Sequence, residues 1–259
     1  GRFDLLNKVM RTDKIMEGIG ITGEEISMSN YPRLGLGYIS FSCELPTVSD
    51  LAVRQAIAYC FDRDQTATDY AGAFGIRVDG YYGIGQWMYG IIAGTTPYPI
   101  QSPEDPDDAE AVARYEEELA AYEALSLDQL NHYEVNIEQA VRILSEAGWN
   151  LNEEGLREKD GVVLDLHLIY PEGNNIHESL QTNLVENLEK AGIRLTMEAV
   201  PMAELLSRWY QQADRTDDMI FLASNFNIVF DPSITFALDG GLNYPNLRDE
   251  ALYNAAVAM

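Results

Sequence analysis

Basic residues are scarce in this sequence. Its 259 residues include 17 Lys and Arg against 42 Asp and Glu, which gives a formal net charge of -25 at pH 7. The resulting field repels phosphate backbones and anionic lipid surfaces, so it argues against a nucleic-acid partner and against a polybasic membrane patch. The sequence also lacks an apolar run of the roughly 20 residues that a membrane-spanning helix needs.

Cysteine and histidine are scarce as well. Cys43 and Cys60 are too few for a disulfide framework or a zinc site in a chain of this size. We expect two small buried thiols, with a disulfide between them as the alternative. His132, His167 and His177 show no H-x-x-H or H-E-x-x-H spacing, so we expect no metal site. Phosphate-binding loops and G-x-S-x-G are also lacking, and we expect neither a cofactor nor a catalytic residue.

Hydrophobic residues nevertheless make up 46% of the chain, enough for a large core in one or two domains. The sequence begins at Gly1 without a signal peptide, and it ends inside an expected helix over residues 250–259. We therefore expect a piece of a longer protein and give no weight to the missing targeting signals.

The clearest architecture lies in the second half of the chain. Residues 162–170 and 193–199 alternate between apolar and polar side chains, and residues 176–191 carry leucines at helical spacing. A strand, a helix and a strand form a βαβ unit, whose strands are parallel neighbours joined by a right-handed crossover. A helix over residues 202–212 and a strand over residues 219–223 repeat the theme. The loops that follow such strands usually hold ligands.

The first half combines helices, one strand and an irregular segment. Ser49 or Asp50 is the expected cap of one helix, and Asn136 with Gln139 forms an N-x-x-Q cap of another. The expected elements are helices over residues 5–16, 51–61 and 136–147, a second helical stretch that ends near residue 74, and a strand over residues 36–43.

Acidic residues are concentrated over residues 102–124, where Arg114 is the only base. Calcium-binding loops need acids at alternating positions around a glycine turn, and this block lacks that pattern. We expect an exposed, solvated helix.

Residues 75–101 contain six glycines and a set of aromatic residues, which excludes a regular helix or strand over the whole segment. Such a long loop either packs as an irregular wall or presents its rings to a ligand. Both interpretations stay open for the rings of Tyr81, Tyr82, Trp87, Tyr89 and Tyr98.

Residues 53–64 read VRQAIAYCFDRD and resemble the VRQAIAYAIDRD helix of the peptide/nickel type (family 5) of extracellular solute-binding proteins, the substrate receptors of ABC importers. The resemblance continues in order through residues 156–161, residues 170–193, and residues 218–219 with 230–232. Together these stretches cover most of residues 30–247, and four collinear matches are far more specific than one.

The matching residues also have plain structural explanations. We expect Arg54 and residues 62–64 to form ion pairs or lobe-packing contacts rather than to touch a ligand. We expect Asn174 to cap the helix that follows it. Asp231 and Pro232 are expected in a turn or at a helix start, because proline fits the first helical turn.

The resemblance implies an α/β fold: a periplasmic-binding-protein-like (type II) lobe with a mixed, partly parallel sheet flanked by helices. Residues 1–30 would end the N-terminal lobe or a crossover segment, residues 31–247 would form the C-terminal solute-binding lobe, and residues 248–259 would begin a truncated helix leading back to the missing lobe. A monomer is expected, extracellular as a cell-surface lipoprotein or periplasmic.

The implied function is that of the substrate-binding component of an ABC importer, which captures an oligopeptide or another small solute between two lobes and delivers it to a membrane permease. It implies no enzyme. The alternatives are an extracellular carboxylate-based hydrolase, suggested by the abundant acids, and a sensor domain that uses the same fold without transport.

One departure from the family pattern concerns the solute. Peptide-binding relatives usually carry an aspartate in a W-x-x-D-Y stretch, where it pairs with the α-amino group of a peptide. Residues 224–230 here read SNFNIVF, with neither Trp nor Asp. An ammonium bound there would be poorly compensated, so the resemblance supports a solute receptor better than a peptide receptor.

The resemblance places the ligand at the loop after the last strand and at the glycine-aromatic segment. Aromatic rings bury much apolar area with few rotamers to freeze, and amides donate and accept without a charge to desolvate. The expected ligand-binding residues are Tyr82, Gln86, Trp87, Tyr89, Asn225, Phe226, Asn227 and Asp231.

Overall fold

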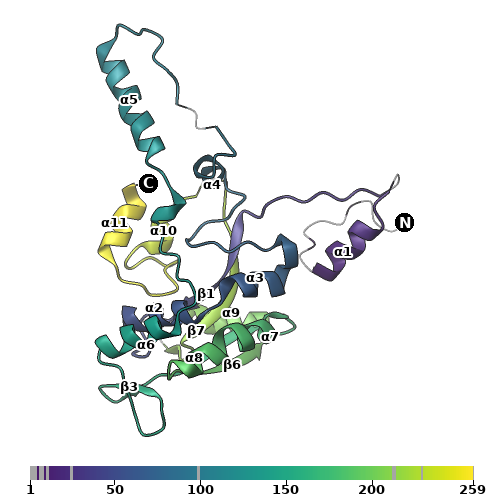
Figure 1. The fold of residues 1–259 in the computed structure, drawn as a ribbon, viewed down its shortest axis with the longest axis vertical. Helices are drawn as coiled ribbons and strands as arrows, with labels where there is room; N and C mark the ends of the chain where they lie inside the picture. The colour runs from purple at the N-terminus through teal and green to yellow at the C-terminus, as the bar shows by residue number, and fades with distance from the viewer. Residues whose placement is uncertain are drawn as a thin grey trace.

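A four-stranded mixed sheet lies at the centre of the molecule (Figure 1). In the computed structural model the described residues are 5, 9, 12–23, 26–97, 100–211, 214–228 and 230–258. β1 pairs antiparallel with β7, whereas β5 pairs parallel with both β7 and β6. The strands lie in the order β1 (Gly35–Phe41), β7 (Met219–Asn225), β5 (Asp165–Pro171) and β6 (Arg194–Val200).

The predicted βαβ unit is confirmed, because β5 and β6 are parallel neighbours joined by a helical crossover. The crossover helix is continuous, but its middle turn is a π-helix, which a leucine pattern cannot reveal. Its three parts are α7 (Ile176–Leu180), the π-helical η3 (Gln181–Val185) and α8 (Glu186–Lys190).

The strand predicted over residues 162–170 is divided into two, which corrects that prediction. The first part pairs in a small antiparallel sheet, made of β2 (Asn150–Leu151), β3 (Arg157–Lys159) and β4 (Val162–Val163). The chain changes partner at Leu164, whose N–H donates to the carbonyl of Arg157 over 2.8 Å and whose carbonyl accepts from Arg194 over 3.0 Å. The apolar alternation continues through this switch, so the sequence pattern does not show it.

Other predicted boundaries shift by a few residues. The helix predicted over residues 5–16 is wrong in its first part: α1 begins at Thr12 and continues to Gly20, and residues 5 and 9 are not helical. Residues 6–8, 10 and 11 lie outside the described residues, as do Tyr98, Gln212 and Met259. The remaining helices are α1 (Thr12–Gly20), α2 (Leu51–Cys60), α3 (Arg63–Ala71), α4 (Trp87–Ile92), α5 (Ala109–Glu123), α6 (Ile137–Glu146), α9 (Met202–Tyr210), α10 (Ser233–Phe236) and α11 (Glu250–Ala258), with 3-10 turns η1 (Gly72–Phe74) and η2 (Leu127–Gln129).

Helices cover both faces of the sheet. Alternation along β5 sends Leu166 and Leu168 to one face and Ile169 to the other, and all three are at most 1% exposed. On the second face α9 buries Leu205 and Trp209 against Ile169. Each buried leucine stabilises the fold by roughly 1.5–3 kcal/mol. The core of the first face comes from α2, α6 and the crossover helix, and includes Val53, Ile57, Leu144, Leu184 and Leu188.

Helix caps agree with the predicted capping residues. Asp50 caps α2 by accepting from Ala52, and Asn136 caps α6 by accepting from Gln139, each over 2.9 Å. Asn174 accepts from the N–H of Ile176 over 3.0 Å, but the N-cap position of the crossover helix is Asn175, one residue later than predicted. Capping therefore sets where these helices begin.

The two thiols are free, as predicted. Cys60 is fully buried, and burial raises the pKa of its thiol to about 12. Cys43 is half-buried, and burial raises the pKa of this thiol as well.

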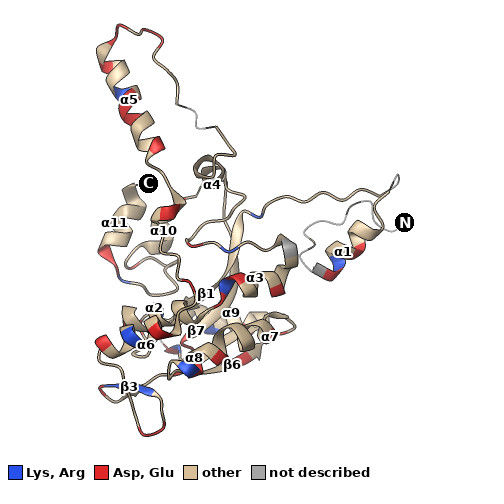
Figure 2. Cartoon of the chain, viewed as in Figure 1, with Lys and Arg blue, Asp and Glu red and all other residues tan. Residues whose placement is uncertain are grey.

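The acidic block forms α5, an exposed helix with no buried residue that projects from the body of the molecule (Figure 2). It begins at Ala109 rather than at residue 102, because Asp108 caps it by accepting from the N–H groups of Glu110 and Ala111. Across the described residues, the helices are too short or too polar to span a bilayer.

Candidate functional site

The carboxyl ends of β5, β6 and β7 lie at one edge of the sheet, because these strands are parallel. β1 runs the other way and begins at that edge, where Gly35 pairs with Asn225. The loop after β7 and the segment before β1 therefore meet at the place where α/β sheets usually bind ligands. We call this the carboxyl edge.

The glycine-aromatic segment packs against the chain that enters β1. The N–H of Gly85 donates to the carbonyl of Arg33 over 2.9 Å. A Cβ atom on Gly83 would lie 2.4 Å from the carbonyl carbon of Leu34, and one on Gly35 would lie 1.7 Å from the carbonyl oxygen of Ser224. Only glycine allows such close backbone approach, so this contact explains part of the glycine pattern.

Tyr81 is the centre of an aromatic cluster at the carboxyl edge. Its ring centroid lies 4.9 Å from that of Phe226, 5.5 Å from that of Phe236 and 6.3 Å from that of Tyr38. Phe226 is only 9% exposed, and burial raises the pKa of Tyr81. The cluster forms a wall that joins the two segments, and our prediction of site residues omitted Tyr81, although it lies in the aromatic run.

The predicted ligand-binding residues differ in exposure. Trp87 is 48% exposed at the start of α4, and Tyr82 stacks on Tyr89 with centroids 5.6 Å apart. Asn227 is exposed and makes no hydrogen bond to any residue that the structure describes. Asp231 is also exposed, and its Oδ1 accepts from the N–H of Ser233, the first residue of α10, in the turn just before that helix.

Gln86 is the most buried polar residue of the predicted set. Its side chain is 2% exposed, and Oε1 accepts from the N–H of Gly83 over 2.9 Å. The Nε2 group has no hydrogen-bond partner among the described residues. An unsatisfied buried donor costs about 1–3 kcal/mol of free energy.

An ion network fastens the start of the glycine-aromatic segment to α3. Asp79 binds Arg63 over 2.8 Å, Arg77 over 3.2 Å and His132 over 2.8 Å. Burial acts to raise the pKa of Asp79, but His132 and the two arginines outweigh it and lower that pKa. Asp64 pairs with Arg77 over 2.7 Å, so the ion pairing expected of residues 62–64 is confirmed for Arg63 and Asp64.

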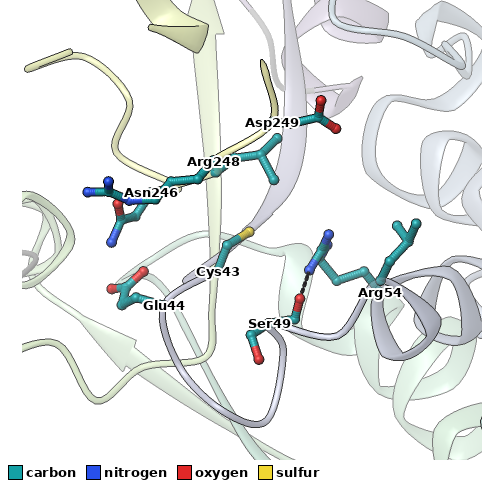
Figure 3. Close-up of a pocket in the computed structure, with 9 residues that line it drawn as sticks. Cys43, Glu44, Ser49, Arg54, Asn246, Arg248 and Asp249 are labelled. Atoms are coloured by element: carbon teal, nitrogen blue, oxygen red, sulfur yellow. Dashed lines mark hydrogen bonds between the residues drawn. The ribbon is translucent and has the colours of Figure 1, made fainter. Parts of the chain in front are cut away.

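A cavity of about 390 Å³ lies at the other end of β1 (Figure 3). Figure 3 shows Arg54 reaching from α2 toward Ser49, whose carbonyl accepts from its guanidinium over 2.7 Å. Arg54 therefore has a structural role, through carbonyl groups rather than through an acid. The described residues that line the cavity include none of the predicted ligand-binding set; they are Cys43, Glu44, Ser49, Leu51, Arg54, Asn246, Leu247, Arg248 and Asp249.

A second charged cluster lies where β5 and β6 meet α9. One ligand atom each of His167, Glu198 and Asp217 lie within 4.8 Å of one another, a grouping that could hold a metal ion. Arg208 already pairs with Asp217 over 2.5 Å and with Glu198 over 3.0 Å, and the hydrogen bonds to Asp217 raise the pKa of Arg208. The guanidinium supplies the positive charge there and ties α9 to the sheet. The sequence spacing gave no sign of this cluster.

Comparison with known proteins gives a consistent result. The family described as bacterial extracellular solute-binding proteins, family 5 Middle, matches residues 12–243. The oligopeptide-binding protein AppA of Bacillus subtilis is 29% identical over 115 residues, which are 43% of this chain and 21% of AppA.

Solved structures share the fold. AppA from Bacillus subtilis, in complex with a nonapeptide, has a TM-score of 0.65 at 19% identity and covers 88% of this chain. Lactococcal OppA, with an endogenous peptide in the closed conformation, has 0.65 at 14% identity and covers 96%. NikA from Brucella suis, with Fe(III)-EDTA, has 0.57 at 18% identity and covers 96%. This chain spans only 39%, 42% and 46% of those three chains.

Proposed function

We propose that this chain, which belongs to the bacterial extracellular solute-binding proteins of family 5, forms the C-terminal solute-binding lobe of an ABC-importer receptor. The observation that carries the proposal is the meeting of two distant segments at the carboxyl edge, residues 81–89 and residues 225–231, in a chain matched by this family over residues 12–243. Residues 1–30 and 248–259 would then lead from and to a second lobe.

The proposed mechanism is closure of two lobes around a solute, after which a membrane permease accepts the closed form. The exposed Trp87 ring would cover apolar parts of the solute, and the free amide of Asn227 would donate and accept hydrogen bonds. The Tyr81 cluster, which includes the predicted site residue Phe226, would hold both segments in place. Binding through rings and amides allows release, because no strong ion pair has to break.

The solute class follows from the names of the relatives. AppA is named as an oligopeptide-binding protein, OppA was solved with an endogenous peptide, and NikA was solved with Fe(III)-EDTA. We propose an oligopeptide or another small solute as the cargo, bound outside the cytoplasm by a cell-surface lipoprotein or a periplasmic protein. The name of AppA and the family description both denote binding proteins, which supports a receptor without enzymatic activity.

Native mass spectrometry of the protein that contains this chain, mixed with peptides of three to nine residues, tests the proposal. We expect saturable retention of peptides, weakened by roughly 1–3 kcal/mol in Trp87→Ala and in Asn227→Ala. Leu151→Ala is the matched control, because Leu151 is 59% exposed on the small sheet, far along the chain from both segments. Equal retention of peptides by all variants would show that the binding cleft lies elsewhere. Turnover of a peptide or an ester would favour the hydrolase alternative.

A further inference from the structure

We infer that Arg33 binds a carboxylate of the solute and thereby makes the receptor selective for anionic solutes. The inference rests on the proposed function, because it assigns one charge preference to the same edge of the sheet. It identifies a residue that neither the family resemblance nor the aromatic pattern singled out.

Arg33 lies in a part of the chain that has no acids. Residues 33–35 contact Gly83, Gly85 and residues 224–226 at the carboxyl edge. In the sequence around these contacts, over residues 26–35, 81–101 and 219–230, Arg33 is the only charged residue. The whole chain carries 42 acids, so a region of this kind is unusual. An incoming anion meets a local positive charge there. The first acid after the third stretch is Asp231, whose Oδ1 already accepts from the N–H of Ser233.

Nearly all of the other described arginines pair with an acidic side chain or donate hydrogen bonds to backbone carbonyl groups. Arg54 and Arg157 donate to backbone carbonyls. Arg114 on the exposed helix α5 has no acidic partner among the described residues, and neither has Arg33. The arginines that pair with an acid are Arg63, Arg77, Arg142, Arg194, Arg208, Arg215 and Arg248.

The guanidinium of Arg33 makes one side-chain hydrogen bond, which leaves its two Nη groups available. Its Nε donates to Oδ1 of Asn225 over 2.9 Å, whereas Nη1 and Nη2 have no partner among the described residues. A guanidinium has five N–H donors, so the two Nη groups keep the geometry that binds both oxygens of a carboxylate. An amide oxygen orients the group without cancelling its charge.

The backbone around Arg33 is fixed by both segments of the proposed site. The carbonyl of Arg33 accepts from Gly85 over 2.9 Å, and the carbonyl of Leu34 accepts from Phe226 over 3.3 Å. The unused Nη groups of Arg33 donate hydrogen bonds, so the ligand group that fits them is an acceptor, and the positive charge of Arg33 favours an ionised one.

The first test uses succinate and its neutral analogue succinamide as probes. Succinate should perturb the NMR signals of the Arg33 side chain and of the Asn225 amide in a saturable way, whereas succinamide should not. We expect Arg33→Gln to weaken succinate binding roughly ten- to a hundredfold, the range for one charge-assisted hydrogen-bonded contact. Arg114→Gln is the matched control, because it removes the same charge from α5.

Asn225→Asp is the second variant, since it keeps Arg33 but supplies an internal carboxylate at hydrogen-bond distance. We expect it to lower succinate affinity as Arg33→Gln does. Saturable succinate binding that survives both variants overturns the inference, and so does the absence of succinate binding to the unaltered protein.

The peptide experiment separates this inference from the proposed function. Peptides with a free C-terminal carboxylate should be retained over their C-terminal amides, and Arg33→Gln should abolish that preference while retention of the amides persists. Retention of both forms alike overturns the role of Arg33 and leaves the receptor function standing. Succinate binding that depends on Arg33, without retention of any peptide, supports the anion site and argues against an oligopeptide cargo.

Discussion

The indole Nε1 of Trp149 donates to Oδ2 of Asp50 over 3.1 Å, across 99 residues of sequence. Asp50 also caps α2 through Ala52 and pairs with Lys159 over 3.0 Å. One carboxylate thus joins the start of α2, the end of the α6 region and the small sheet. Trp149 is 2% exposed, and Asp50 is the acceptor of its indole N–H.

Asp50→Ala should lower the free energy of unfolding by about 2–4 kcal/mol. A lost cap costs about 1 kcal/mol, and the buried indole N–H left without an acceptor costs about 1–3 kcal/mol more. Asp62→Ala is the control, because Asp62 caps α3 through Gln65 alone, and it should cost about 1 kcal/mol. Urea unfolding of both variants decides; equal losses would contradict the role of the Trp149 contact.

The same carboxylate makes stability depend on pH. Burial acts to raise the pKa of Asp50, but the N–H of Ala52, Lys159 and Trp149 outweigh it and lower that pKa below 3.8. A lowered folded-state pKa gives stability that is complete above the unfolded value and is lost as the pH falls through the folded one. Asp50→Asn should therefore show a smaller loss of stability than the unaltered protein between pH 4 and pH 2, measured by urea unfolding at each pH.

Phe226 and Trp87 should respond differently to truncation. Phe226 is 9% exposed between Tyr81 and Phe230, so Phe226→Ala should cost about 3–5 kcal/mol of stability. Trp87 is 48% exposed, and Trp87→Ala should leave stability within about 1 kcal/mol. Thermal melts followed by circular dichroism compare the two, and a collapse in Trp87→Ala would assign that ring to the core.

Cys60 should be inert toward alkylation while the protein is folded. It is fully buried with its pKa raised to about 12, and the thiolate is the reactive form. Intact-mass analysis after iodoacetamide treatment at pH 8 should show Cys60 unmodified in buffer and modified in urea. Modification in buffer at the rate seen in urea would show that α2 opens readily.

The acidic helix α5 should tolerate loss of charge. Glu116, Glu117 and Glu118 are exposed and form no ion pair with the described residues. Their joint replacement by Gln should change the free energy of unfolding by less than about 1 kcal/mol, as measured by melts at low and high salt. A larger loss would mean that the block holds a structural partner.

Local patterns predicted much of the fold. The alternation in β5 and β6 and the leucine spacing between them depend on neighbours one to four residues apart, and these patterns placed the parallel pair correctly. The caps Asp50 and Asn136 are local as well. The family resemblance supplied the lobe architecture that these local signals left undetermined.

Contacts between residues far apart along the chain could not be predicted from the sequence. Three features depend on residues far along the chain. They are the change of strand partner at Leu164, the central place of Tyr81 in its aromatic cluster, and the ion pairs of Asp79. Arg33 was missed for the same reason, since its meaning comes from Asn225, 192 residues away. The predicted site residues stay a prediction, although the structure brings the two segments that carry them together.

The direction of β1 has a mechanical consequence. β1 is the outer strand of the sheet, paired with β7 alone, and its first residue Gly35 lies beside Asn225. A pull on the chain that precedes Gly35 acts first on the Gly35–Asn225 pair. The following residue pairs then separate one after another, up to the pair of Phe41 and Met219. Tension on the preceding chain therefore acts first at the carboxyl edge, where we propose that the solute binds. We expect a bound solute to raise the force needed to separate β1 from β7.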